Sequence, residues 1–163
     1  MSSMRSELKF SVQRIASWDV PVIRYRRPCA ELSLSVRGTI ANSISTTDAG
    51  KRCLKEWKAN VATVCKASRG ETPWSSAWTY AITLGLAFSP ALHGWQPLDV
   101  ENFLKPILDA MAAGLFCQED QIPSNIERFN YDDSNFRHLL VHRFPDIASA
   151  TEEVVAIHVS AVE

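Results

Sequence analysis

Residues 98–122 gather carboxylates, an amide and a lysine around one short amphipathic segment. Apolar residues recur through this segment at helical spacing, so they form a stripe that must face a core. Asn102, Lys105 and Asp109 follow the spacing i, i+3 and i+7, and they therefore share another face of the expected helix. Side chains of these types in one place are typical of a metal-dependent phosphodiester site.

Asp99 and Glu101 come just before this helix. A proline is tolerated in the first turn of a helix but costs roughly 3 kcal/mol deeper inside, so Pro106 predicts a start near residues 101–102. Two residues apart in an extended segment, the two carboxylates share a face, whereas on a helix they would point apart. We therefore expect them to converge just before the helix begins.

Glu119 and Asp120 return after the helix, which we expect to end around Gly114. Oxygen-rich clusters of this kind suit Mg²⁺ or Mn²⁺, which take carboxylate ligands and keep waters for a reaction. The alternative is a purely structural role, because an amphipathic helix with a polar outer face is ordinary.

The spacing of these residues resembles the signature of the RusA family of Holliday junction resolvases. That signature reads Asp-x-Asp-Asn-x-x-Lys-x-x-x-Asp-Ala-Leu, followed by an Asp-Asp-x-Gln-(Ile/Val) segment. Seven residues fall on matching positions, namely Asp99, Asn102, Lys105, Asp109, Ala110, Gln121 and Ile122. Three departures are Glu101 for the second aspartate, Met111 for leucine, and Gln118-Glu119-Asp120 for Asp-Asp-x.

The resemblance covers roughly residues 30–160. Residues 45–50, which open a helix after a strand-like run at 32–36, are similar to the family's amino-terminal strand, loop and helix. Residues 1–163 are expected to form a single RusA-like domain, with 1–30 as an additional strand and arm and 31–163 as the family-like core.

The resemblance implies an α+β fold, with a mixed sheet under two main helices, that pairs into a homodimer. The other expected strands lie at 8–12, 78–88, 126–131, 137–144 and 153–161. In residues 78–88, large apolar residues at every even position predict one strongly buried face.

The function implied is Mg²⁺-dependent cleavage of four-way DNA junctions by paired symmetric cuts. Asp99 and Glu101, with Glu119 or Asp120, would hold the metal, and Lys105 would steady a phosphate oxygen. Asn102 and Asp109 would orient these groups. The alternatives are a nuclease of the same fold acting on other branched or flap DNA, and a non-catalytic DNA-binding or assembly protein with a degenerate site.

Net charge is only −1, but its distribution is uneven. Residues 1–70 carry 13 of the 17 Lys and Arg residues against 5 acidic ones, and residues 71–163 carry the other 4 against 13. We expect the basic half to contact the DNA backbone. The candidates are a stripe of Lys51, Lys55 and Lys58 on a helix over 46–68, capped by Ser45 or Thr46, and a cluster of Arg24, Arg26 and Arg27. A merely solvated surface is the alternative for both groups.

The chain has 163 residues, of which 46% are hydrophobic and 21% charged, as expected of a globular protein with a real core. No apolar run approaches the ~20 residues of a membrane span. The first residues lack the apolar centre of a secretion signal, which favours a cytoplasmic location.

Overall fold

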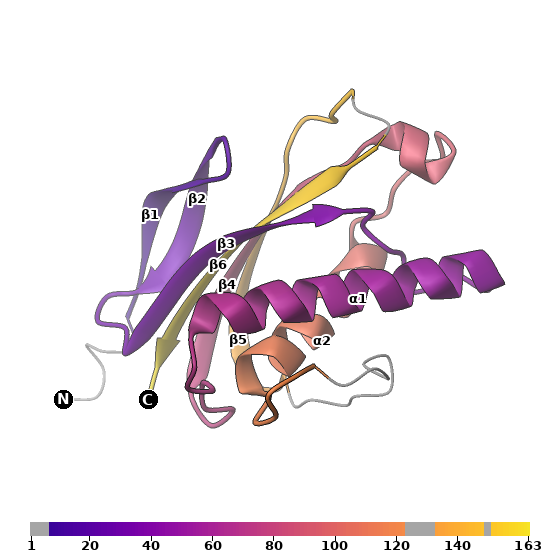
Figure 1. Ribbon diagram of the computed structural model, residues 1–163. Helices are drawn as coiled ribbons and strands as arrows, with labels where there is room; N and C mark the ends of the chain where they lie inside the picture. Colours follow the sequence, from indigo (N-terminus) through magenta and orange to yellow (C-terminus); the bar gives the residue numbers. More distant parts are fainter. Residues whose placement is uncertain (1–6, 123–132, 149–150) are drawn as a thin grey trace.

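The computed structural model describes residues 7–122, 133–148 and 151–163, and Figure 1 shows the arrangement of their helices and strands. In chain order the elements are β1 (Leu8–Ile15), β2 (Trp18–Tyr25), β3 (Ala30–Gly38), α1 (Asp48–Arg69), β4 (Thr79–Ala87), the 3-10 turn η2 (Pro90–His93), α2 (Glu101–Phe116), β5 (Phe136–Arg143) and β6 (Glu153–Val162). The strand expected at 126–131 lies outside the described residues.

Four of the strands form one mixed sheet in the order β3-β6-β4-β5. β6 is antiparallel to β3 and to β4, and β4 is parallel to β5. Both helices lie on one face of this sheet (Figure 1), and the main core fills the space between the two layers. The expected α+β fold with a mixed sheet and two main helices is confirmed.

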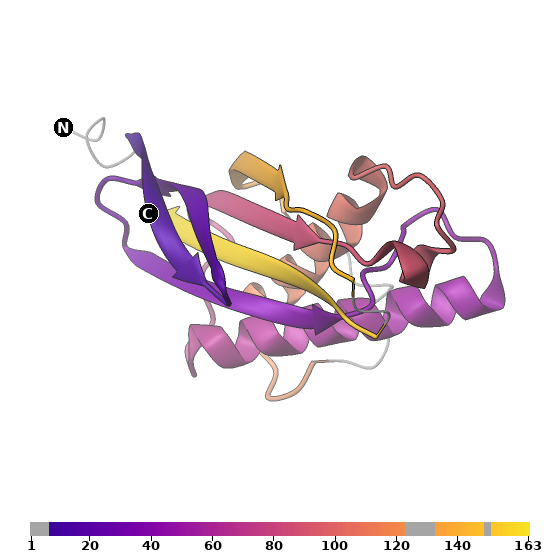
Figure 2. The ribbon, with the colours of Figure 1, turned by 90° about the horizontal axis from the view of Figure 1, so that it is seen from above.

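A hairpin of β1 and β2 packs on part of the other face of the sheet (Figure 2). β2 presents its edge to the sheet, because two of its backbone N–H groups donate to side chains there. Ile23 donates to Thr83 Oγ1 at 3.0 Å, and Tyr25 donates to Ser160 Oγ at 3.0 Å. The region expected to be a strand and an arm is therefore a two-stranded hairpin that seals a second core.

The hairpin explains why β4 is buried on both faces. The large residues at even positions form the strongly buried face that the sequence predicted, and this face meets the helices. The small residues at odd positions lie on the other face, where Ala81 packs against Ile23 and Tyr25. Gly85 leaves room for the ring of Phe144, since an added Cβ would come within 2.3 Å of that ring. The small residues of β4 thus allow the hairpin and Phe144 to pack closely on this face.

The amino-terminal end of α1 is capped by Thr47, whose hydroxyl accepts a hydrogen bond from the backbone N–H of Gly50 at 3.0 Å. The expected caps, Ser45 and Thr46, were wrong by one or two residues. Side chains of Ser and Thr compete for this role in a run such as 45–47, and only the residue with extended backbone next to the first turn can fill it.

The two helices run in the same direction, because contacts join both pairs of ends. Near the amino-terminal ends, the backbone N–H of Ser43 donates to the carbonyl of Asn102 at 2.9 Å. At the carboxyl-terminal ends, the guanidinium of Arg69 donates to the carbonyls of Gly114 at 2.9 Å and Cys117 at 2.8 Å. Arg69 thereby satisfies carbonyls that the last turn of α2 leaves unpaired.

No helix in the described residues is long and apolar enough to span a membrane.

Candidate functional site

α2 begins at Glu101, as expected, although this start leaves Pro106 beyond the first turn. Val100 has right-handed helical backbone, so the extended segment expected to bring Asp99 and Glu101 to one face was a wrong prediction. Asp99 lies beside the first turn of α2. The Asp99 carboxylate accepts a hydrogen bond from the backbone N–H of Glu101 at 3.2 Å. A negative charge in this place also interacts favourably with the helix dipole. Both carboxylates are exposed to solvent. Asp99 therefore stabilises the start of the helix while keeping its carboxylate open to a ligand.

The connection from β4 to α2 is held by the buried carboxylate of Glu153. Its oxygens accept hydrogen bonds from the backbone N–H groups of Ile40 and Ser89, each at 2.8 Å, and lie 2.9 Å from His93 Nε2. The ring of His93 in turn packs against Phe103 of α2, with 5.4 Å between centroids. Sequence reasoning missed this cluster, because Glu153 and His93 are 60 residues apart.

Arg143, at the end of β5, lies next to the loop that carries Asp99. Its Nη1 donates to the carbonyl of Leu98 at 3.3 Å, and its guanidinium sits 5.2 Å from the centre of the Phe88 ring. Its Nη2 lies 3.4 Å from Asp146. Sequence reasoning also missed this residue. No sequence pattern indicates this contact, because it depends on the parallel pairing of β4 and β5, which brings the carboxyl ends of both strands to one edge.

Lys105 and Asp109 lie on one face of α2, as the sequence predicted. The ammonium group of Lys105 is 2.7 Å from one carboxylate oxygen of Asp109 and 3.7 Å from one of Asp133. The hydrogen bond to Asp109 raises the pKa of Lys105 above its usual value, and partial burial opposes this rise. The lysine side chain is 65% exposed, so it is also open to a ligand. Asp133 is an addition that sequence reasoning did not find.

The four carboxylates expected to bind metal do not come together. Lys66 of α1 donates to the backbone carbonyl of Glu119 at 2.8 Å, which holds that residue beside the carboxyl-terminal end of α2. Asp99 and Glu101 lie at the other end of this 16-residue helix, a separation of about 24 Å along its axis. Within the described residues, no three His, Cys, Asp or Glu side chains are grouped in a way that could hold a metal ion.

Of the three lysines expected on an outer stripe of α1, two are exposed and one is not. Lys51 and Lys55 are open to solvent, whereas Lys58 is only 7% exposed. The prediction that Lys58 belongs to the exposed stripe is therefore wrong. The physical reason is that the helix face carrying Lys51 continues into Ala62 and Cys65, which are buried in the core that includes α2. Only the first turns of α1 leave this face uncovered.

The three arginines of the second basic cluster have different surroundings. Arg24 is paired with Glu31 and is only 24% exposed. Arg26 is exposed and lies 3.6 Å from Glu7. Arg27 is exposed and lines a hollow of about 310 Å³. Arg26 and Arg27 thus remain available as phosphate contacts, and the charge of Arg24 is offset within the protein.

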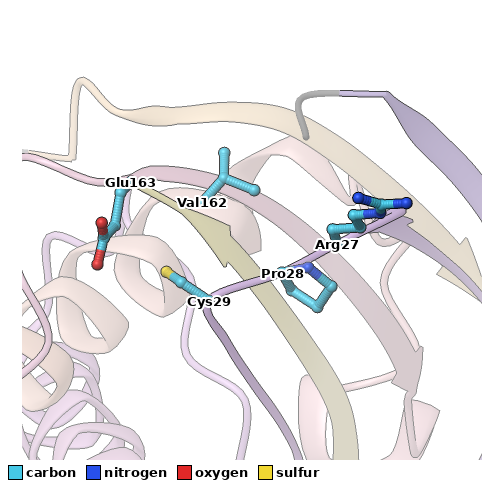
Figure 3. A pocket seen from close by; sticks show the side chains of 5 residues that line it. All are labelled: Arg27, Pro28, Cys29, Val162 and Glu163. Carbon is cyan, nitrogen blue, oxygen red and sulfur yellow. The ribbon is translucent and has the colours of Figure 1, made fainter. Parts of the chain in front are cut away.

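The hollow beside Arg27 lies where the chain enters β3, at the opposite end of the sheet from Asp99. In Figure 3 the sulfur of Cys29 and the carboxylate of Glu163 lie on one side of it, and Arg27 lies on the other. Burial, followed by the charge of Glu163, raises the pKa of the Cys29 thiol. At neutral pH this cysteine is a thiol, which makes it a poor nucleophile.

The residues that could act on a phosphodiester are therefore Asp99 and Glu101 at the start of α2, with Lys105 one turn further along. Arg143 supports the loop beside them. The chain matches no protein-family model, and no curated protein matches it.

Proposed function

We propose that the protein is a Mg²⁺-dependent endonuclease that acts on branched DNA, with the four-way junction as its substrate. One observation carries the proposal. The exposed carboxylates of Asp99 and Glu101 lie at the same end of the helical layer as the exposed lysines Lys51 and Lys55, because the two helices run in the same direction and the loop before α1 is hydrogen-bonded to the first turn of α2 through Ser43 and Asn102.

The residues present fit a smaller metal site than the sequence suggested. Asp99 and Glu101 cannot share one ion with Glu119 or Asp120 across the length of α2. Two carboxylates suffice for Mg²⁺, however, because this ion commonly takes one or two protein carboxylates and completes its shell with waters and substrate phosphates. Asp99 and Glu101 would hold the ion, which when bound supplies Lewis-acid stabilisation of charge on the phosphate.

The other residues would position the DNA. Lys105 reaches a phosphate oxygen as a point charge, and Asp109 and Asp133 direct its ammonium group. Lys51 and Lys55 neutralise backbone phosphates next to the cut. A homodimer would place two such sites around a two-fold symmetric junction, each making one cut. A DNA substrate also fits the expected cytoplasmic location.

A second candidate is a branched-DNA-binding protein that does not cut. Two observations favour it, namely the separation of the four expected metal ligands and the engagement of Lys105 by two carboxylates. Both candidates use the same basic residues, and they differ only in whether Asp99 and Glu101 hold a metal.

A cleavage assay on synthetic four-way junctions and linear duplex, with and without Mg²⁺, tests both candidates. The proposed endonuclease cuts the junction only with Mg²⁺ and leaves the duplex intact. Junction binding without cleavage would support the second candidate, and equal affinity for junction and duplex would contradict both. Asp19→Asn is the matched control for substitution of Asp99, because Asp19 is an exposed aspartate on the hairpin, far from α2.

A further inference from the structure

A serine, a histidine and a glutamate form a hydrogen-bonded chain on the sheet face that α1 and α2 do not cover. Ser33 of β3 lies directly opposite His158 of β6 in the antiparallel register. Directly opposite residues have their Cβ atoms about 5 Å apart, so two short polar side chains can meet. Ser33 Oγ is 2.7 Å from His158 Nδ1, and His158 Nε2 is 3.0 Å from Glu31 Oε2.

The order of the groups fixes where the protons lie. An ionised carboxylate only accepts hydrogen bonds, so the imidazole carries its proton on Nε2 and donates it to Glu31. Nδ1 then has a free lone pair, and the hydroxyl of Ser33 donates to it. The other oxygen of Glu31 is paired with the guanidinium of Arg24, which holds the carboxylate in place. A hydroxyl, a base and a group that orients the base are thus in line.

The base and the nucleophile differ in their exposure to solvent, with the base buried and the nucleophile open. His158 is 3% exposed, and burial lowers the pKa of its imidazole, with a further lowering from Arg24 and an opposing rise from Glu31. The imidazole is therefore neutral at pH 7 and able to accept a proton. Ser33 is exposed, since β3 is the edge strand of the sheet, and a reagent can approach it from solvent.

We propose that Ser33 is an activated nucleophile in an acyl-transfer site for carboxylic esters, with His158 as its base and Glu31 as a positioning residue. Ser33 Oγ forms a bond to the carbonyl carbon of the ester as its proton passes to His158 Nδ1. The bond from that carbon to the ester oxygen then breaks, and the proton on Nδ1 passes to the leaving alcohol. The product is a seryl ester on Ser33. Water hydrolyses it in a second step that returns the free hydroxyl.

This site is separate from the candidate nuclease site. α1 and α2 cover the face of the sheet opposite to the one that carries Ser33, since Leu34, the next residue, packs in the core beneath the helices. The esterase proposal therefore does not depend on the proposed nuclease function, and each can fail alone.

The test is covalent labelling with a fluorophosphonate probe. Ser33 Oγ bonds to phosphorus, the P–F bond breaks, fluoride leaves, and His158 takes the hydroxyl proton. Intact-mass measurement gives the rate of labelling, and peptide mapping gives the position. Release of 4-nitrophenolate from 4-nitrophenyl acetate reports the same step with an ester.

We expect one adduct, on Ser33, and none in Ser33→Ala. Glu31→Gln keeps a hydrogen-bond acceptor but loses the charge that fixes the imidazole, so the labelling rate should fall about tenfold or more, with an unchanged fold by circular dichroism. Ser35→Ala is the matched control, because Ser35 lies two residues further along the same face of β3, opposite Ala156 instead of a histidine. It should label at the parent rate.

Absence of labelling in the folded parent protein would overturn the proposal, as would labelling spread equally over several serines. An unchanged rate in Glu31→Gln would overturn the role of Glu31 and make the cluster a structural bracket between β3 and β6. Cleavage or binding of DNA by Ser33→Ala at the parent level is expected, and it keeps the two sites distinguishable.

Discussion

The backbone N–H of Ser43 donates to the carbonyl of Asn102 at 2.9 Å, and this carbonyl is the one that Pro106 leaves without a partner. In an α-helix the carbonyl of residue i accepts from the N–H of residue i+4, and proline has no N–H. Pro106 is the sixth residue of α2, beyond the first turn where proline is well tolerated. The loop before α1 therefore supplies the missing donor and ties itself to the candidate site.

Removal of that donor should destabilise the protein. Ser43→Pro deletes the N–H, and we expect the free energy of unfolding to fall by about 0.5–1.5 kcal/mol, the net contribution of a typical hydrogen bond. Ser43→Ala is the matched control, because it keeps the N–H and should unfold at nearly the parent urea concentration. Urea denaturation followed by circular dichroism measures both changes.

A double substitution tests the link to Pro106 directly. Pro106→Ala restores an N–H within the helix, so the carbonyl of Asn102 keeps a partner when Ser43 becomes proline. The cost of Ser43→Pro should therefore be smaller in the Pro106→Ala background than in the parent. Equal costs in the two backgrounds would show that the hydrogen bond does not compensate for the proline.

Substitution of the four carboxylates should separate them into two groups. Asp99→Asn removes one metal ligand and one negative charge near the phosphates, so cleavage should be lost while junction binding persists or improves. Glu119→Gln and Asp120→Asn change the far end of α2, and both should cut the junction at the parent rate. Junction cleavage and electrophoretic mobility shift assays measure these outcomes.

Loss of cleavage in Glu119→Gln or Asp120→Asn would contradict this grouping. It would require the segment after α2 to leave Lys66 and reach the start of the helix when DNA binds. Unchanged turnover in Asp99→Asn would instead refute the proposed metal site.

Local periodicity predicted the helices and the main strands, and the structure shows where such reasoning stops. The alternation in residues 78–88 predicted a strand with one strongly buried face, but nothing in that stretch indicates that a hairpin some 60 residues earlier packs on the other face. Helical periodicity likewise shows which residues share a face, but it does not show which turns of that face are covered by other elements. It could not reveal that Lys58 is covered while Lys51, seven residues earlier on the same face, is open.

The candidate site was predictable as a list of residues and not as a geometry. Spacing placed Lys105 and Asp109 on one face of a helix, because both lie in one regular element. It could not give the direction of the chain after that element, which decides whether Glu119 meets Asp99 and whether Asp133 meets Lys105. Contacts made across loops depend on the whole fold, so Asp133, Arg143 and Glu153 became visible only in the structure.

Neutralising the exposed lysines of α1 should weaken the salt dependence of DNA binding. Each lysine that contacts a phosphate adds about 0.9 to the slope of log affinity against log salt, so Lys51→Ala with Lys55→Ala should reduce the slope by up to roughly 2. The control is Arg14→Gln with Arg137→Gln, which removes the same charge from two exposed residues elsewhere. Fluorescence anisotropy over a range of salt concentrations gives both slopes. If the salt slope of the lysine double variant equals that of the parent, this helix face is merely solvated. Arg26 and Arg27 would then be the candidates for phosphate contact.

Stability should depend on pH through His158, which faces Ser33 and Glu31 of β3 and is also influenced by Arg24 of β2. Burial lowers its pKa below 6.5, so the unfolded chain binds a proton at this residue more readily than the folded protein does. Its contribution to stability is therefore complete above pH 6.5 and is lost as the pH falls below that value through the folded-state pKa. His158→Gln removes this proton uptake and keeps every other titrating group. In urea titrations at pH 7.5 and pH 5, the parent should lose stability relative to His158→Gln as the solution is acidified. A constant difference between the two proteins would show that His158 takes up its proton as easily in the fold as in the unfolded chain.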